Sequence, residues 1–197
     1  MTVVEKILEY KVKCPVCGTD LCVEEFLYDM PLVGKVILSS GRCQRCGYRW
    51  SDVRLAEPRG PRKIIYEVDK PGDENAIVVR ASTAAIVIPE LGIEVKPGPA
   101  ALGFITTIEG LIMDVIEKTE FLCSEPDAPL NECRKKLELL NKARDGLIKY
   151  TVILIDPEGV SAIVSEKARE EPLSEEEITA YYQGLDLIKE GDKGEEK

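Results

Sequence analysis

Two pairs of cysteines have the spacing of metal ligands. Each pair has the pattern C-x-x-C followed by glycine, and 25 residues separate the pairs: Cys14/Cys17 with Gly18, and Cys43/Cys46 with Gly47. Two thiolates on one tight turn bind a Zn²⁺ ion from the same side at about 2.3 Å per bond, and the residue that follows often needs a positive φ, which glycine adopts without strain. Two such turns facing each other make a closed tetrahedral site. The sequence therefore predicts one structural zinc ion per chain, bound by these four cysteines.

Two alternative chemistries for these pairs remain open at this point. A redox C-x-x-C normally begins a helix within a βαβ unit, and neither pair has that context. An iron–sulfur cluster is the other alternative, because it also uses four thiolates.

The other three cysteines have no ligand spacing. Cys22 falls within a strand-like run, and we interpret it as a small buried apolar side chain. Cys123 and Cys133 flank a proline-containing break between two helical segments. A reducing compartment favours free thiols for this pair, and a disulfide is the alternative if the chain comes from a hyperthermophile.

Missing residues and motifs argue against an enzyme. The chain of 197 residues contains no histidine, which excludes Ser-His-Asp and Cys-His nucleophilic sites and zinc sites that include histidine. Neither GxxxxGK[ST] nor GxGxxG occurs. The apolar runs are far shorter than the ~20 residues that cross a bilayer, and no long apolar segment opens the sequence. We expect a cytoplasmic protein with no enzymatic activity and no membrane association.

The charge is unevenly distributed. The net charge is −10, and residues 166–197 contain eleven acids and five bases, a net of −6. Residues 42–63 instead contain seven bases and two acids, a net of +5. Such a basic stretch on an acidic protein indicates an acidic protein surface, an RNA, or the protein's own tail as its partner, or a solvated face with no partner.

The elements that must position these residues fall into three segments. Residues 1–57 are predicted to form the zinc ribbon, with strands at about 21–27, 33–38 and 48–55 around the cysteines. Residues 58–165 show short β runs at intervals of about ten residues, which favours a sandwich or barrel. The run at 150–155 ends in an Asp-Pro-Glu-Gly turn, which predicts a strand returning over 160–164.

Apolar residues recur at helical spacing over about 107–122 and 131–148, inside the β domain, and again over about 175–189 in the acidic segment 166–197. These three ranges are therefore predicted to be helices. Thr106 with Glu109, and Ser174 with Glu177, form predicted capping boxes. Gly110 is unfavourable in a first helical turn by about 1 kcal/mol relative to alanine, which suggests a close backbone approach.

Three runs together with the paired cysteines resemble a known family. They are IPELGIE at 88–94, GFITTIEGLI at 103–112 and TVILIDPEG at 151–159. The combination is similar to the ZPR-type zinc-finger proteins, in the single-module form of archaeal members rather than the two tandem modules of eukaryotic ones. The resemblance implies a mainly β fold with a four-cysteine ribbon, a double-stranded β-helix-like (jelly-roll) domain with a helical insertion, and a C-terminal helix.

The resemblance also implies a function. It points to a zinc-binding, protein-binding module with no catalysis, and to chaperone-like action on translation elongation factor one-alpha. The alternative is a nucleic-acid or ribosome-associated ribbon that uses the basic stretch 42–63. The predicted partner-binding residues are Arg45, Arg49, Arg54, Glu90 and Glu109. A solvated turn carboxylate is the competing interpretation of Glu90, and helix capping is that of Glu109.

Overall fold

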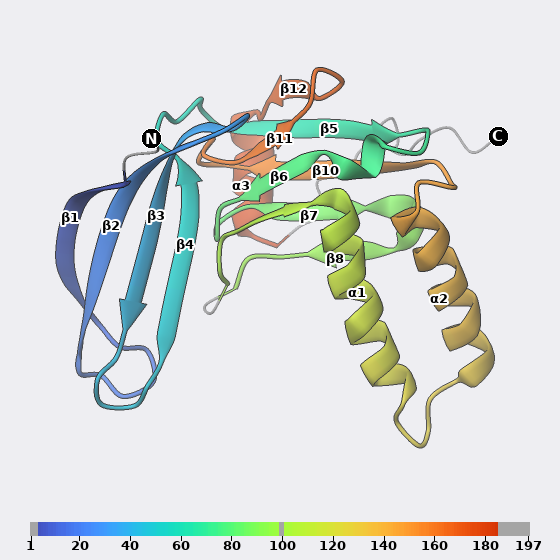
Figure 1. Ribbon diagram of the computed structural model, residues 1–197, viewed down its shortest axis with the longest axis horizontal. Helices are drawn as coiled ribbons and strands as arrows, with labels where there is room; N and C mark the ends of the chain where they lie inside the picture. The colour runs from blue at the N-terminus through green and yellow to red at the C-terminus, as the bar shows by residue number, and fades with distance from the viewer. Residues whose placement is uncertain (1–3, 99–100, 185–197) are drawn as a thin grey trace.

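The computed structural model describes residues 4–98 and 101–184. The fold is mainly β, as expected, and begins with a four-stranded antiparallel sheet in the order β1-β2-β3-β4 (Figure 1). The strands are β1 (Val4–Lys13), β2 (Asp20–Met30), β3 (Gly34–Arg42) and β4 (Arg49–Leu55). The cysteine turns connect β1 to β2 and β3 to β4, so both turns lie at one end of this sheet, the lower end in Figure 1. The predicted ribbon is therefore present, and β1 is a fourth strand that the sequence pattern did not predict.

Two further sheets form the β domain. One has five strands in the order β12-β5-β10-β7-β8, and the other has three in the order β11-β6-β9. Their bounds are β5 (Arg62–Val68), β6 (Ile77–Arg80), β7 (Ala85–Ile88), β8 (Ile93–Val95), β9 (Phe104–Thr107), β10 (Tyr150–Asp156), β11 (Ala162–Val164) and β12 (Arg169–Pro172), with 3-10 turns η1 (Asp73–Asn75) and η2 (Pro89–Leu91). The expected strand after residue 159 exists as β11, but it pairs with β6. The prediction that it returns beside β10 was wrong, because the turn carries the chain to the other sheet.

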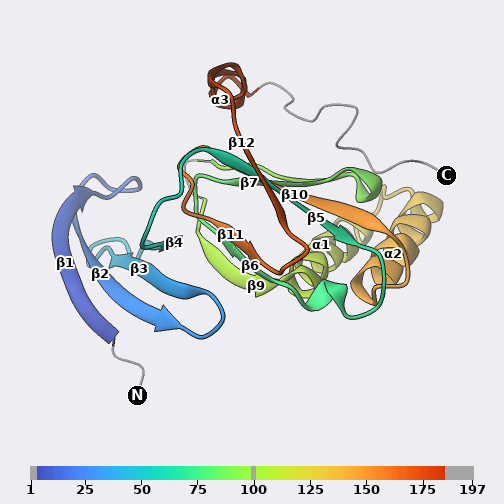
Figure 2. The same cartoon turned by 90° about the horizontal axis from the view of Figure 1, so that it is seen from above.

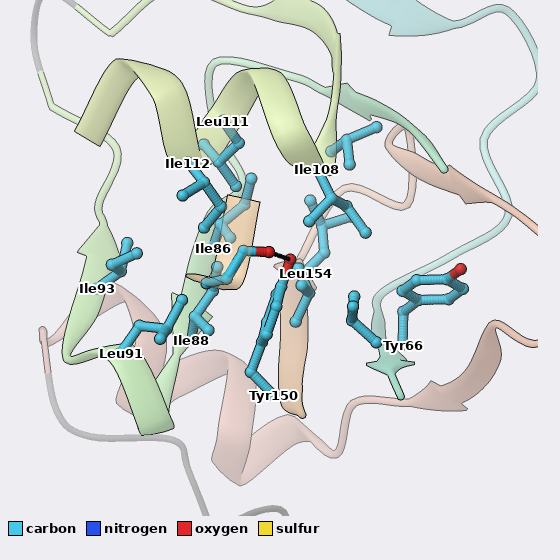
Figure 3. Packing of buried hydrophobic residues seen from close by; sticks show 14 of the residues in the cluster. Tyr66, Ile86, Ile88, Leu91, Ile93, Ile108, Leu111, Ile112, Tyr150 and Leu154 are labelled. Carbon is cyan, nitrogen blue, oxygen red and sulfur yellow. Dashed lines mark hydrogen bonds between the residues drawn. The ribbon is translucent and has the colours of Figure 1, made fainter. Parts of the chain in front are cut away.

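The main core lies between the two sheets and two helices. Its buried side chains alternate along the strands, so that Val152 and Leu154 of β10 point inward while Ile153 and Ile155 point to the opposite face. Figure 3 shows Ile108 and Ile112 of the first helix directed at this inner face. As a result β10 is buried on both faces, which explains its continuous apolar run.

The helical insertion is a hairpin of α1 (Ile108–Cys123) and α2 (Leu130–Arg144). The cap of α1 is Thr107, whose hydroxyl accepts a hydrogen bond from the Gly110 amide at 3.0 Å, so the prediction of a Thr106/Glu109 capping box was wrong by one residue. A Cβ at Gly110 would clash with the Thr106 hydroxyl, so the close neighbour of this glycine is a side chain and not the backbone that was expected. Helix α2 ends four residues before the predicted 148.

A disulfide joins the two helices at the tip of the hairpin. The Cα atoms of Cys123 and Cys133 are 5.8 Å apart, and the two sulfurs are bonded. The expectation of free thiols was therefore wrong, because the antiparallel packing of α1 on α2 brings the two helix ends together. Closing a loop of this length stabilises a fold by roughly 2–3 kcal/mol in the chain-entropy treatment.

The outer face of the five-stranded sheet is covered by the C-terminal helix α3 (Glu175–Tyr182). Tyr181 and Leu173 pack on the outward side chains of β7 and β10, opposite the hairpin (Figure 2). The predicted Ser174/Glu177 capping box is present. The predicted helix ran to about 189, and its part from 185 onward lies outside the described residues. Among the described residues, no helix is long and apolar enough to cross a membrane.

The ribbon and the β domain share a hydrophobic cluster. Val36, Val53 and Leu55 of the ribbon pack with Val79 and Ala162. The backbone amide of Leu55 also donates to the carbonyl of Val160 at 2.7 Å. The segment limits at 57/58 and 165/166 stay predictions. This cluster contains residues from both sides of the 57/58 limit, so the two segments pack against each other there.

An ion-pair network near the β5–η1 turn makes stability depend on pH. Burial opposes ionisation of Asp73, but hydrogen bonds from the Lys167 ammonium (2.6 Å) and the Asp69 amide (3.2 Å) hold its pKa at about 2. Since the pKa of an unfolded aspartate is about 3.9, ionised Asp73 stabilises the fold above that value, and this contribution is lost as the pH falls towards 2.

We expect Asp73→Asn to lower the free energy of unfolding by about 1–2 kcal/mol at pH 7 and by much less near pH 2. Urea unfolding at several values between pH 7 and pH 2 measures the free energy of unfolding of both proteins. Zinc loss at acid pH affects both equally, so it cancels from the difference between variant and wild type. The exposed neighbour Asp69 provides the control Asp69→Asn, for which a smaller effect is expected. Parallel pH profiles for wild type and Asp73→Asn would contradict this account.

Candidate metal centre

The structure brings the four predicted ligands together. The sulfur atoms of Cys14, Cys17, Cys43 and Cys46 all lie within 4.8 Å of one another. The Sγ atoms of Cys14 and Cys46 are 3.6 Å apart, and those of Cys17 and Cys43 are 3.5 Å apart. Four sulfurs at about 2.3 Å from one tetrahedral ion lie about 3.8 Å from each other, so both of these separations are close to those around a bound Zn²⁺ ion. All four positions are filled by protein, which is the arrangement of a structural site.

The two cysteine turns have the same local geometry. In each turn the glycine amide donates to the carbonyl of the first cysteine, from Gly18 to Cys14 at 2.9 Å and from Gly47 to Cys43 at 3.0 Å. Gly18 has φ +69° and Gly47 has φ +77°, which is the left-handed region where only glycine is unstrained. The predicted role of these glycines is confirmed by these angles.

A small apolar cluster supports the sulfurs from one face of the sheet. Leu21 and Val23 of β2 are buried there, with Tyr10, Tyr48 and Trp50 packed around them and around Cys14 and Cys43. Few side chains contribute to this cluster. Metal binding is therefore expected to supply most of the stability at this end of the ribbon.

Thr19 contributes to the site, and the cysteine spacing alone did not reveal it. Its hydroxyl lies 3.0 Å from Sγ of Cys17 and 3.4 Å from Sγ of Cys43, so it can donate to one thiolate at a time. The pKa of the Cys43 thiol is lowered to about 5, chiefly by this hydroxyl and further by the backbone amides of Cys46 and Arg45, and the hydroxyl also lowers the pKa of Cys17. A hydroxyl directly after a C-x-x-C-G turn is the sequence signal that could have identified it.

We expect Thr19→Val to weaken zinc binding about tenfold, because groups that hydrogen-bond to metal ligands typically change metal affinity by 10–100-fold. Competition with a chromogenic chelator measures the affinity. Thr19→Ser retains the hydroxyl and should bind zinc nearly as tightly as wild type. Equal affinity of the valine variant would show that the hydroxyl does not support the thiolates.

Cys22 is exposed, so the interpretation as a buried side chain was wrong. Side chains alternate between the two faces of β2, and the buried neighbours Leu21 and Val23 occupy the face that carries the apolar cluster. Cys22 therefore lies on the opposite, open face, where its Sγ is 3.3 Å from a carboxylate oxygen of Glu9.

The second half of the basic stretch, from Arg54 to Lys63, is neutralised within the chain. Arg54 donates to both carboxylate oxygens of the buried Glu25, at 3.1 and 2.9 Å. Ion pairs also join Arg59 and Arg62 to Glu170, and Lys63 to Glu171. The acidic C-terminal segment thus pairs with part of the basic stretch, which was one of the partners indicated by the charge pattern.

The predicted partner-binding residues lie in different elements. Arg45 is exposed in the second cysteine turn and Arg49 is exposed at the start of β4. Glu90 lies in η2, where its carboxylate accepts hydrogen bonds from the Thr151 amide (3.1 Å) and hydroxyl (3.0 Å), so it connects η2 to β10. Glu109 is half-buried in the first turn of α1. The arginines thus belong to the ribbon and the two glutamates to η2 and α1 of the β domain.

Fold and site together define a zinc-ribbon protein whose ribbon is joined to a jelly-roll domain. Residues 6–59 match the ZPR1 zinc-finger domain, and residues 72–185 match the ZPR1 jelly-roll domain. The chain belongs to the ZPR1 zinc-finger family and carries one module of it.

Relatives support the same assignment. A ZPR1-like protein of Methanocaldococcus jannaschii is 39% identical over 182 residues, which cover 90% of this chain and 92% of that protein. A ZPR1-like protein of Pyrococcus horikoshii is 35% identical over 197 residues, covering 96% and 88%. The zinc finger chaperone zpr1 of Schizosaccharomyces pombe is 35% identical over 153 residues, which cover 73% of this chain but 33% of that protein.

Proposed function

We propose that this protein is a non-enzymatic binding module with chaperone-like action on translation elongation factor one-alpha, held in shape by a zinc ion on Cys14, Cys17, Cys43 and Cys46. The observation that carries the proposal is the shared module: 73% of the chain aligns with a protein named as a zinc finger chaperone. The elongation factor is the client that the family resemblance implies.

The closed metal site supports the absence of catalysis. Metal-assisted catalysis needs an open coordination position for water or substrate, and four cysteine sulfurs occupy the tetrahedral positions here. The role assigned to the metal is to hold two turns and the strands that they connect.

The hairpin tip supports protein binding. Phe121, Leu122 and Leu130 are 68%, 65% and 72% exposed on adjacent ends of α1 and α2. The hairpin projects from the sheets in Figure 1. Contiguous exposed apolar side chains on a soluble domain typically mark a contact surface for another protein.

The test is calorimetry of the purified protein with its cognate elongation factor one-alpha, in the GTP, GDP and nucleotide-free states. We expect association in at least one state and about tenfold weaker binding for Arg45→Glu/Arg49→Glu. Lys70→Glu/Lys149→Glu reverses two exposed charges elsewhere and is the matched control. Arg54 is left out of the variant because its loss would leave Glu25 buried without its cation.

Two results would overturn the proposal. Absence of association in all three nucleotide states would remove the elongation factor as client. Hydrolysis of GTP by this protein in the absence of the elongation factor would contradict its assignment as a non-enzyme. Glu90 and Glu109 are tested in the same assay as Glu90→Gln and Glu109→Gln, and unchanged affinity would exclude them from the contact.

A further inference from the structure

The open face of the ribbon carries three cations in one row across the sheet. The strand register places Lys11 opposite Cys22, Cys22 opposite Arg42, and Arg42 opposite Arg49. Residues directly opposite on neighbouring strands project from the same face of a sheet. All four are exposed, so Lys11, Arg42 and Arg49, here named the cationic row, face solvent together around the thiol of Cys22.

Among the described residues Arg42 and Arg49 have no carboxylate partner, whereas Lys11 interacts electrostatically with Glu9 and Asp20 without forming an ion pair. Like charges directly opposite each other destabilise a sheet, and Arg42 and Arg49 are such a pair. Within residues 4–98 and 101–184 no ion pair forms to any member of the row, whereas the other basic residues between 54 and 63 are paired with Glu25, Glu170 or Glu171. The row is therefore a charged surface that an external anion can stabilise.

A hollow lies over the same rows of the sheet. It has a volume of about 590 Å³, and Arg42 and Arg49 line it together with the Ser40 and Ser51 hydroxyls and the amide side chain of Gln44. These groups donate hydrogen bonds to carboxylates or carbonyl oxygens. The Glu24 carboxylate also lines the hollow, but it is paired with the Lys6 ammonium at 2.6 Å.

We propose that the cationic row binds an extended acidic segment of a protein partner, laid across the strands. Four strands span about 14 Å, which is the length of four or five extended residues. Such a segment can place two or three carboxylates over the row while its backbone meets the hydroxyl and amide groups. This inference rests on the proposed function as a protein-binding module and adds the chemistry of the partner surface.

A nucleic acid fits this face less well. The next row on the same face begins with Glu9 and Glu24, so a long polyanion that continues along the strands beyond the cationic row meets two carboxylates, whereas a short segment laid across the strands stays over the row.

The metal site offers a competing explanation of the arginines. Four thiolates around Zn²⁺ carry a net charge of −2, and Arg42 directly precedes the ligand Cys43. If the arginines served only to balance that charge, their removal would weaken zinc binding and leave external ligands unaffected. The experiment must therefore measure both properties on the same variants.

The test uses the zinc-loaded full chain and a fluorescein-labelled octapeptide with glutamate at every second position and serine elsewhere. Fluorescence anisotropy at low ionic strength measures its binding, with the glutamine version of the peptide as a control and an eight-nucleotide uridine RNA as a second ligand. The variant is Arg42→Gln/Arg49→Gln, and the matched control Lys70→Gln/Lys149→Gln removes the same charge from exposed positions elsewhere.

We expect the glutamate peptide to bind, the glutamine peptide to bind at least tenfold more weakly, and the arginine variant to lose about tenfold in affinity for the glutamate peptide with its zinc affinity unchanged. Equal peptide affinity for wild type and the arginine variant would overturn the proposal. The proposal would also be overturned if the arginine variant lost affinity for the RNA but not for the glutamate peptide. A third contrary result is a wild-type protein that does not bind the peptide, together with an arginine variant that has lost zinc affinity. Peptide binding without any affinity for elongation factor one-alpha would keep this surface and reject only that client.

Discussion

A Cys43→Ser/Cys46→Ser variant is expected to retain no zinc after purification, whereas the wild-type protein carries about one ion per chain. The variant keeps two of the four clustered sulfurs, those of Cys14 and Cys17. Structural zinc sites of this kind contribute on the order of 10 kcal/mol or more, so losing half of the ligands weakens binding by more than about a thousandfold. Elemental analysis of both proteins measures the metal directly.

Cys22→Ser is the matched control for this experiment. Cys22 is exposed on the open face of β2 and lies outside the four-sulfur cluster, so its variant should hold the same amount of zinc as wild type. Iron in place of zinc, or full zinc in the double variant, would contradict the assigned ligand set.

Zinc removal by a strong chelator is expected to unfold the cysteine end of the ribbon and to leave the jelly roll folded. Ordering a residue costs about 1–2 kcal/mol of backbone entropy, and burying one large apolar side chain returns about 1.5–3 kcal/mol. The apolar cluster beside the cysteines fully buries only Leu21 and Val23 in addition to two of the ligands. Without the metal it cannot hold the two turns and the adjoining strand ends.

Amide hydrogen exchange on the metal-free protein measures how far this unfolding extends. The sequence predicts a zinc ribbon over residues 1–57, and if all of it depended on the metal, protection would be lost throughout the ribbon. The cluster that joins Val36, Val53 and Leu55 to the β domain changes this expectation. Protection should disappear near residues 12–22 and 41–50 and persist in the half of β3 and β4 next to the jelly roll. A single cooperative collapse of the whole chain on metal loss would show that the two parts form one folding unit.

Local signals carried most of the successful predictions. The cysteine turns were predictable because ligand spacing and the following glycines are set within five residues. The hairpin helices and α3 were predictable because periodicity and capping are also local. The same holds for the central β10, whose continuous apolar run reflects burial on both faces.

The errors arose where the outcome depends on long-range placement. The strand after the turn at 156–159 was assigned beside β10, and only the packing of two sheets decides that it joins β6 instead. The disulfide depends on how α1 and α2 pack, which the spacing of Cys123 and Cys133 does not determine. Cys22 was wrongly predicted to be buried, because the periodicity indicated a strand but not which face of that strand packs against other side chains.

The partner surface was predicted only in part for the same reason. A sum of charges over residues 42–63 treats seven bases as equivalent, but the fold pairs Arg54 with Glu25 across the ribbon sheet and pairs the bases at 59–63 with residues more than a hundred positions later. The cationic row in turn includes Lys11, which lies outside that stretch and joins it only through strand register.

The position of β10 determines the order in which the chain can fold as it is synthesised. The ribbon has all four cysteines once residue 46 has emerged, so it can bind zinc early. The five-stranded sheet cannot close then, because β10 lies between β5 and β7, and its pairs with β5 join residues 82 (150 − 68) to 94 (156 − 62) positions apart. Until residue 156 is available, the apolar edges of β5 and β7 stay unpaired, and pairings this distant in sequence are slow to form. We therefore expect a nascent chain to pass through a stage with a metal-bound ribbon and an open sheet, whose unpaired strand edges are exposed to aggregation.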